Sequence, residues 1–470
     1  MLTRLIWLFL SLLIPATSSA QSGDAAPAAV PRETSDAFTK DISKEAVVVE
    51  RYVTHAVYQA DGSGTREVAA VIRVQSEAGV QSLAVLRFAY NTVNDAADID
   101  YVRVRKPDGK IIATPDANIQ DMPADVTRVA PVYSSIHEKH VTVKALGVGD
   151  VLEYQVRFRT AKPQIAGQFW YEHTFLQGNV VQDEELEISV PKDKYVKVSR
   201  PQLAPQVKED GARRIYKWKS VNLQREDSAE QAPKREGHHP SVQVTTFGSW
   251  EEVGRWYGDL QRPQLKVTPE IRAKASEITK GLTGDENKMH ALYDFVSTQV
   301  HYVSLSFGVG SYQPHAADEV LGNQYGDCKD KHTLLAALMK AAGYDAWPAL
   351  INSSRKIDAD LPSPGQFDHV ITLARLGPEA IWLDTTAEVA PFGLLISVLR
   401  DKQVLVIPAE EPALLMKTPE APRFAASSTF TADGKLTGDG TLAAHMERSS
   451  RGDEEVMLRA AFRRVPPAQW

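Results

Sequence analysis

The change in hydrophobic period along the chain constrains its fold more than any other feature. From Val47 to Trp218, apolar and polar residues alternate in short runs, as in strands with one buried face. Tyr101–Arg105 is the clearest run, and the Pro107-Asp108-Gly109 segment after it is typical of a hairpin turn. Helical signals begin only near residue 268. We therefore predict an α+β protein whose N-terminal part is an antiparallel β domain, either a sandwich or a strongly bent sheet.

The later part of the chain carries helix start signals and then returns to the strand period. Thr268 followed by Pro269 predicts one helix start, and Thr283 with Glu286 forms a capping box that predicts another. Three strands are predicted next, and from Gln403 the period is again two, with a turn expected at Asp433-Gly434. These patterns predict a central core of helices plus an antiparallel sheet, and then the start of a C-terminal β domain.

Length and composition together predict several parts. A chain of 470 residues is long enough for two to four domains. The predicted parts are a signal peptide at 1–20, a flexible lead-in at 21–45, a β-rich domain at 46–221, a polar linker at 222–246, an α+β core at 247–400 and a C-terminal β domain at 401–470. The helical pattern that starts at Asp453 is still short at Trp470, so we expect the last domain to be truncated.

The N-terminus has the features of a cleavable export signal. Arg4 supplies the positive charge, Leu5–Ile14 is a short apolar segment, and Ser18-Ser19-Ala20 supplies small residues for cleavage. The apolar segment is short for a membrane span. We therefore expect an exported protein, located in the periplasm, with no transmembrane helix in the mature chain.

Charge and histidine spacing exclude several classes of function. The chain has 53 Lys and Arg against 60 Asp and Glu, mixed along its length, so no nucleic-acid partner is expected. His55, His140 and His173 are scattered, and the His238-His239 pair has no further ligand nearby. No arrangement matches known metal-site spacings, so we expect neither a metal nor another cofactor.

Cys328 is the only cysteine in the chain. Asp327 is a good N-cap, and the sequence from Cys328 to Ala342 is helical in composition, with Gly343 after it. Free backbone N–H groups and the helix dipole favour a thiolate in the first turn of a helix, and the thiolate is the reactive form. The alternative is a buried, inert cysteine, which is common in proteins. An unpaired thiol in an exported protein is a liability unless it is buried or used.

His369 and Asp384 are the candidate partners of this thiol. Both flank residues 375–378, which have the composition of a tight turn. If a hairpin is centred within that segment, His369 and Asp384 lie directly opposite each other, about 5 Å apart at Cβ and on one face. A shift of the turn by one residue would leave them staggered.

These residues suggest a division of roles. Cys328 is the candidate nucleophile, His369 the base that takes the thiol proton and later returns it, and Asp384 the group that orients the imidazole. His332, one helical turn after Cys328, is the second candidate for the base, but no acidic partner is evident.

A developing oxyanion also needs hydrogen-bond donors. The backbone N–H of Cys328 is one candidate. Gln313 is our first choice for a side-chain donor, with Gln324 and Tyr302 as alternatives.

Three sequence blocks resemble the transglutaminase-like core of the papain-like cysteine enzyme superfamily. They are Tyr325–Lys331, Phe367–Val370 and Trp382–Asp384, which occur in the order Cys, His, Asp. The upstream β region, with Phe247–Trp250 at its end, resembles the DUF3857 domain that precedes such a core in exported bacterial proteins. The strands after Gln403 resemble the β domain that commonly follows it.

The resemblance implies acyl chemistry through a thioester. An amide of a protein or peptide, including one of the cell envelope, would be attacked by Cys328, and water or an amine would then resolve the thioester. The superfamily includes hydrolases, cross-linking enzymes and inactive members, so hydrolysis and transfer both stay open. The alternative function is a catalytically silent cell-envelope binding or scaffold protein in which Cys328 is inert. Oligomeric state and calcium dependence are not determined by the sequence.

Overall fold

The computed structural model describes residues 42–199, 204–223, 240–305 and 312–469. The predicted signal peptide, most of the predicted lead-in and the His238-His239 pair lie outside these residues. None of the helices in the described ranges is long and apolar enough to cross a membrane.

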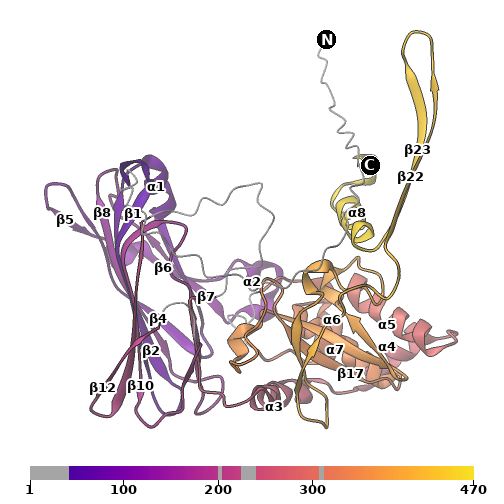
Figure 1. Cartoon of the computed structure of the whole chain (residues 1–470), viewed down its shortest axis with the longest axis horizontal. Helices are drawn as coiled ribbons and strands as arrows, with labels where there is room; N and C mark the ends of the chain where they lie inside the picture. Colours follow the sequence, from indigo (N-terminus) through magenta and orange to yellow (C-terminus); the bar gives the residue numbers. More distant parts are fainter. Residues whose placement is uncertain (1–41, 200–203, 224–239, 306–311, 470) are drawn as a thin grey trace, which may run out of the picture. The chain divides into compact units, whose positions relative to one another are not determined.

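The N-terminal β domain is built on an eight-stranded sheet (Figure 1). In spatial order its strands are β12 (Gln206–Asp210), β13 (Arg213–Asn222), β10 (Val180–Pro191), β1 (Val47–Tyr58), β2 (Gly64–Val74), β8 (Val151–Thr160), β4 (Asp95–Arg105) and β5 (Ile111–Ala113). Neighbouring strands are antiparallel except β1 and β10, which run parallel with Val48 beside Val180. The predicted antiparallel β domain is confirmed, with this one parallel pair as the exception.

A second sheet packs on the first. It contains β3 (Val85–Asn91), β7 (Ile136–Thr142) and β6 (Ile119–Pro123). Leu86 and Val141 of this sheet share an apolar cluster with Val104, Leu152 and Val156 of the large sheet. The domain is therefore a sandwich, the first of the two predicted alternatives. Short helices fill its connections: α1 (Glu77–Leu83), α2 (Val126–Val129) and the 3₁₀ turn η3 (Pro131–Tyr133).

The predicted linker ends in a strand. A third sheet contains β11 (Lys197–Val198), β14 (Val242–Thr245) and β9 (Trp170–His173). In it Val242 pairs with His173 and Thr245 with Trp170. Residues 242–245, which the sequence placed in a polar linker, thus belong to a sheet with strands of the β domain. All four are buried, which explains why they leave the solvated linker pattern.

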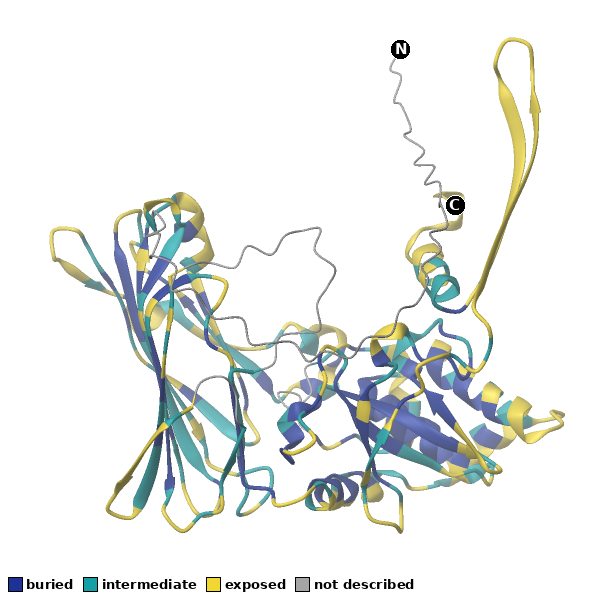
Figure 2. Cartoon of the chain, viewed as in Figure 1, coloured by how far each residue is buried: buried dark blue, intermediate teal, exposed yellow. Residues whose placement is uncertain are grey.

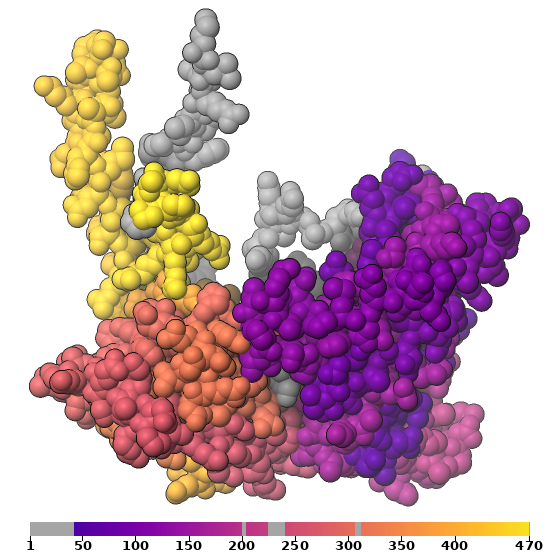
Figure 3. Space-filling view, turned by 180° about the vertical axis from the view of Figure 1, so that it is seen from behind, coloured from indigo at the N-terminus to yellow at the C-terminus, as the bar shows by residue number. Residues whose placement is uncertain are grey.

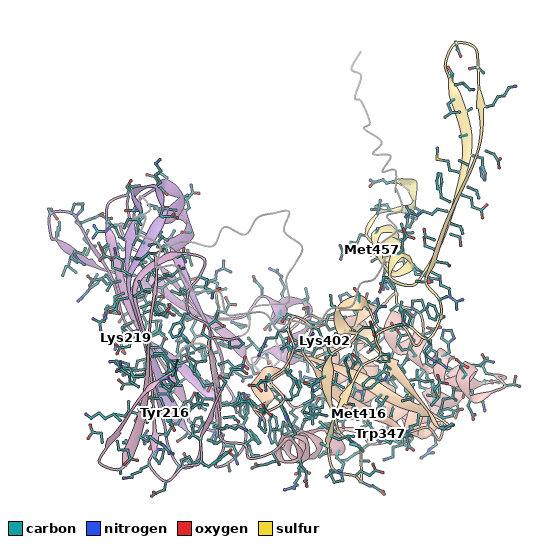
Figure 4. The ribbon with its side chains drawn as sticks, viewed as in Figure 1. Tyr216, Lys219, Trp347, Lys402, Met416 and Met457 are labelled. Carbon is teal, nitrogen blue, oxygen red and sulfur yellow. The ribbon has the colours of Figure 1, made fainter. Side chains whose placement is uncertain are left out.

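The central core contains a five-stranded antiparallel sheet. Its strands, in spatial order, are β19 (Glu379–Leu383), β18 (His369–Leu376), β17 (Ala346–Ile351), β20 (Gln403–Val406) and β21 (Leu414–Lys417). Trp347 and Met416 pack in the apolar layer on this sheet, and both are labelled in Figure 4. Because β20 pairs with β17, the core sheet continues past residue 400, where we placed the domain boundary.

Five helices accompany the core sheet. They are α3 (Trp250–Gln261), α4 (Pro269–Thr279), α5 (Asp285–Gln299), α6 (Ala317–Asn323) and α7 (Cys328–Ala341). The predicted start of α4 is confirmed, since the Thr268 side chain accepts a hydrogen bond from Ile271 N. The predicted capping box of α5 is wrong. Gly284, with a φ of 81°, precedes that helix and makes no side-chain cap.

α7 is the buried helix of the core. It packs against β17 and β18 on one side and against α4, α5 and α6 on the other (Figure 1). All but its last residues are buried, as the dark colouring in Figure 2 shows. Its predicted end is confirmed: Gly343 has a φ of 91° just after the helix.

The C-terminal strands form a long hairpin, β22 (Ser427–Leu436) and β23 (Leu442–Arg451), followed by α8 (Asp453–Arg464). Every residue of β22 is exposed, and Figure 3 shows the hairpin as a projecting column of atoms. The turn predicted at Asp433-Gly434 is wrong, because both residues lie inside β22. The chain reverses between Thr437 and Thr441 instead, where Gly440 adopts a φ of 85°.

Candidate active site

The start of α7 holds Cys328 in a buried polar turn. Asp327 caps the helix: its carboxylate accepts hydrogen bonds from Lys329 N at 3.1 Å and Asp330 N at 3.2 Å. Asp330 returns the contact by accepting from Asp327 N at 3.3 Å, which completes a capping box. A Cβ on Gly326 would lie 2.7 Å from Asp330 Cβ, so this turn requires glycine. The predicted N-cap is confirmed, and Cys328 is the first helical residue.

The hairpin of β18 and β19 positions His369 and Asp384, but not in the predicted register. Leu376 pairs with Glu379, so the turn is one residue later than we expected. Gly377 begins it with a φ of 58°, a conformation that glycine adopts without strain. His369 and Asp384 are therefore diagonal rather than directly opposite. A displacement of two residues keeps both on the same face, so they still meet.

Asp384 is held from several sides. Its Oδ2 lies 3.2 Å from His369 Nε2. Its Oδ1 accepts hydrogen bonds from the Thr386 backbone N–H at 2.9 Å and from the Thr386 hydroxyl at 2.7 Å. The Tyr293 hydroxyl of α5 donates to the backbone carbonyls of Asp384 and Ala390 at 3.1 and 3.0 Å. This network fixes the carboxylate toward the imidazole.

Cys328, His369 and Asp384 form one buried group. Their exposures are 2%, 8% and 3%. The Cys328 side chain is hydrogen-bonded to the imidazole that contacts Asp384. Burial alone would lower the pKa of His369, but the Asp384 charge, its hydrogen bond and the contact with Cys328 raise that pKa well above 6.5. Burial likewise opposes ionisation of Asp384, yet His369 and Thr386 lower its pKa. The arrangement therefore favours a charged imidazolium between two acidic groups.

A pocket of about 330 Å³ opens over His369 and Asp384. Its other lining residues are Tyr302, Ser304, Leu305, Ser353, Asp368, Thr386, Ile396, Val398 and Leu399. Seven of the eleven lining residues carry polar groups, and Leu305, Ile396, Val398 and Leu399 are apolar, so the wall is mixed and offers a ligand several hydrogen-bonding partners.

The three candidate oxyanion donors differ in position. Tyr302 lines this pocket, and after burial the charge of Cys328 is the next cause that raises its pKa. Gln313 is exposed and follows Tyr312, which packs in the same apolar cluster as Cys328. Gln324 is exposed and ends α6 with a φ of 56°. The structure thus brings Tyr302 to the site, while the role assigned to Gln313 stays a prediction.

Both ring nitrogens of His332 contact residues outside the candidate site. Its Nδ1 lies 2.7 Å from Thr372 Oγ1, and its Nε2 lies 2.9 Å from Gln261 Nε2. Burial lowers its pKa to about 3. Both ring nitrogens have neutral partners, so this second candidate for the base belongs to the packing of α7.

Sequence reasoning missed Thr386 and Tyr293. Thr386 follows Asp384 by two residues, and such short-range Asp-x-Thr contacts are a local pattern that could have been found. Tyr293 lies in an apolar core cluster with Met289 and Leu292 of the same helix. Its contact with the Asp384 carbonyl spans 91 positions along the chain, so no local signal points to it.

One group of possible metal ligands lies elsewhere, on β1 and β10. Ligand atoms of His55, Glu185 and Glu187 all lie within 4.8 Å of one another. The carboxylate of Glu185 already pairs with Lys217 at 2.5 Å and Lys219 at 3.5 Å. These two positive charges oppose a metal ion at that place.

Two family models match separate parts of the chain. The domain of unknown function DUF3857 matches residues 60–226, and the transglutaminase-like superfamily matches residues 272–353. The second match includes Cys328 but ends before His369. No curated protein matches the chain.

One crystal structure shares the fold over most of its length. It is a candidate protease from Parabacteroides distasonis ATCC 8503, with a TM-score of 0.68 and 16% identity over 80% of this chain and 72% of that chain. A candidate cysteine protease from Cytophaga hutchinsonii is 13% identical over 60% of this chain and 88% of that chain, with a TM-score of only 0.23. An M1 zinc metallopeptidase from Deinococcus radiodurans also reaches 0.23, at 9% identity over 44% and 43%. The last two superpositions are too poor to support an argument.

The fold and the thiol–imidazole–carboxylate group resemble those of the papain-like class. Within the chain, residues 60–226 are similar to the DUF3857 domain and residues 272–353 are similar to the transglutaminase-like superfamily.

Proposed function

We propose that this protein is a cysteine enzyme that acts on protein or peptide amides through a thioester. The observation that carries the proposal is the position of His369, hydrogen-bonded to Cys328 and 3.2 Å from Asp384. A nucleophile, a base and a group that orients the base are the three parts that such catalysis needs.

The geometry supports a specific sequence of steps. Asp384 holds Nε2 of His369, so Nδ1 is the nitrogen that takes the thiol proton. The sulfur of Cys328 attacks the amide carbonyl carbon and forms a C–S bond. The C–N bond then breaks, and the imidazolium donates its proton to the departing nitrogen. Water or an amine attacks the resulting thioester, His369 accepts the incoming proton, and the cysteine leaves as the thiol.

Hydrolysis and transfer share the first half of this reaction. They differ only in which nucleophile, water or an amine, reaches the thioester. A protein or peptide substrate, including a cell-envelope component, agrees with the superfamily.

The test uses a cysteine-directed electrophilic probe on the purified full-length protein. Mass spectrometry identifies the labelled residue in wild type, Cys328→Ala and His369→Ala. We expect rapid labelling of Cys328 in wild type and at least a tenfold slower rate in His369→Ala, because that variant lacks the base that takes the thiol proton. An equal rate of Cys328 labelling in wild type and His369→Ala would mean that Cys328 is an ordinary thiol. A screen of peptides with and without added amine then separates hydrolysis from transfer.

A silent binding or scaffold protein is the second candidate. The observation that favours it is the low exposure of Cys328, 2%. Buried cysteines are usually inert. In folded protein, failure of the probe to label Cys328 would support this function instead.

We also propose that the chain is exported to the periplasm with loss of residues 1–20. This proposal rests on the sequence pattern of the N-terminus alone. Expression in a Gram-negative host, fractionation and intact mass measurement test it. A periplasmic species that begins at Gln21 is expected, and a cytoplasmic full-length chain would contradict it.

A further inference from the structure

A side chain of the β domain contacts the turn that carries Cys328. Tyr133 lies in η3, between β6 and β7, and is 2% exposed. Its hydroxyl donates to Asp330 Oδ2 at 2.6 Å and accepts from the Asp327 backbone N–H at 2.8 Å. The two contacted residues flank the nucleophile on both sides. A residue of the β domain thus completes the hydrogen bonding of the nucleophile turn.

The aspartates of this turn also contact basic side chains. Asp330 also accepts from His315, at 2.8 Å from the backbone N–H and 3.0 Å from Nδ1. The Lys329 ammonium pairs with Asp327 and lies 5.9 Å from the centre of the Tyr133 ring. Buried polar networks of this kind are rigid when every member is satisfied and costly when one is not.

Packing extends the contact toward the pocket. Ala130, Tyr133 and Ile136 of the β domain share an apolar cluster with Val303, and Leu305 packs against it. Leu305 also lines the pocket over His369. The segment between β6 and β7 therefore contacts both the turn that carries Cys328 and one wall of the pocket.

A phenol is the group that this position needs. Burial raises the pKa of Tyr133, and the charges of Asp327 and Asp330 raise it further, so the hydroxyl keeps its proton. It can then donate to one residue and accept from the other at once. A phenylalanine ring would fill the same space but would leave Asp330 with one donor fewer and the Asp327 N–H without its phenol partner.

We propose that Tyr133 is a positioning residue for Cys328, so that the DUF3857 domain is part of the nucleophile site. Tyr133 acts through Asp327 and Asp330, which set the direction of the first turn of α7. This inference rests on the proposed function only for the test that measures the reactivity of Cys328.

The test compares Tyr133→Phe with Tyr90→Phe in the full-length protein. Tyr90 is a matched control, since its hydroxyl donates to Asp121 Oδ2 at 2.7 Å within the same β domain. The first readout is the rate of Cys328 labelling between pH 5 and 9. The second is hydrogen exchange of the amides of residues 326–331. Melting curves confirm that each variant is folded.

We expect Tyr133→Phe to slow labelling by about tenfold to a hundredfold, the scale of a misplaced reacting group. Its pH profile should change, and the amides of 326–331 should exchange faster. Tyr90→Phe should stay within about twofold of wild type, as expected of a side chain far from the reacting groups. If Asp330 transmits the effect, Asp330→Asn with Tyr133→Phe is no slower than the slower single variant. Wild-type rates and exchange in Tyr133→Phe would overturn the inference.

Two further outcomes keep the proposals separate. If Cys328 is labelled as fast in His369→Ala as in wild type, the proposed function fails, and amide exchange alone decides the role of Tyr133. If Tyr133→Phe does not fold, 3-fluorotyrosine at position 133 replaces it, since this residue keeps the hydroxyl but makes it a weaker acceptor. A changed labelling rate then supports the inference, and an unchanged rate contradicts it.

Discussion

Two hairpins of this molecule carry the same pair of residue types in different surroundings. In β22–β23, Asp433 lies directly opposite His445. In β18–β19, His369 and Asp384 are only diagonal neighbours. By register alone, the C-terminal hairpin has the better pair. Both of its residues are exposed, whereas His369 and Asp384 are buried beside a thiol.

The difference shows that burial and a third group make the candidate site. Water screens a charged pair on an exposed strand, so the pair contributes little. In the core, α7 and the neighbouring strands bury His369 to 8% exposure, and the effective dielectric falls. The same two side chains then interact strongly, and each changes the ionisation of the other. Spacing locates such a pair, but its surroundings decide its chemistry.

The largest expected contrast is in activity. His369→Ala should lower the rate of amide cleavage or transfer by about a thousandfold or more, because the base is lost. His445→Ala should leave it within about twofold of wild type, because that residue lies on the exposed hairpin. Steady-state kinetics on the best substrate from the peptide screen provides the measurement.

A comparable loss in both variants would break the comparison, because the exposed hairpin would then belong to the site. Equal activity in both would mean that His369 is not the base. Folding of each variant is checked by circular dichroism before kinetics.

The candidate site was largely predictable from the sequence, because the patterns that predict it are local. Asp327 as N-cap, Cys328 in the first turn, and the strands that hold His369 and Asp384 all follow from short-range patterns. The register error had a local cause, since the left-handed Gly377 moved the turn by one residue. The two-residue period preserved the shared face in spite of that error.

Long-range contacts were not predictable. Nothing near Tyr133 in the sequence signals a contact with Asp330, which is 197 positions away. The predicted end of the core at residue 400 failed for the same reason. β20 has the period of any strand, and only its pairing with β17 shows which sheet it joins. The turn in the C-terminal hairpin was misplaced because two glycine-containing candidates, at 433–434 and 437–441, lie within a few residues.

The next contrast is in stability. Ile381→Ala on β19 removes a side chain with 0% exposure and should lower the free energy of unfolding of the core by about 2–5 kcal/mol. Leu442→Ala on β23 removes one with 64% exposure and should change it by less than about 0.5 kcal/mol. Urea unfolding followed by tryptophan fluorescence measures both. A large loss from Leu442→Ala would show that the hairpin face is covered in solution.

The smallest contrast is in the pH dependence of stability, and its sign follows from the two pKa shifts. The pKa of His369 is raised, so its stabilisation is complete below about pH 6.5 and is lost as pH rises through the raised value. The pKa of Asp384 is lowered, so its stabilisation is present above about pH 3.8 and is lost as pH falls through the lowered value. Between about pH 5 and 6.5 both contributions are present.

The melting temperature of His369→Gln should therefore fall furthest below that of wild type near pH 6, and the gap should narrow toward pH 9. Each unit by which the pKa is raised corresponds to about 1.4 kcal/mol. Asp384→Asn supplies the control, because removing the carboxylate removes the main cause of the raised pKa. In that background His369→Gln should lower the melting temperature by an amount that no longer decreases with pH. A gap that widens toward pH 9 in the wild-type background would mean that His369 is neutral in the folded protein, and the charged imidazolium would have to be abandoned.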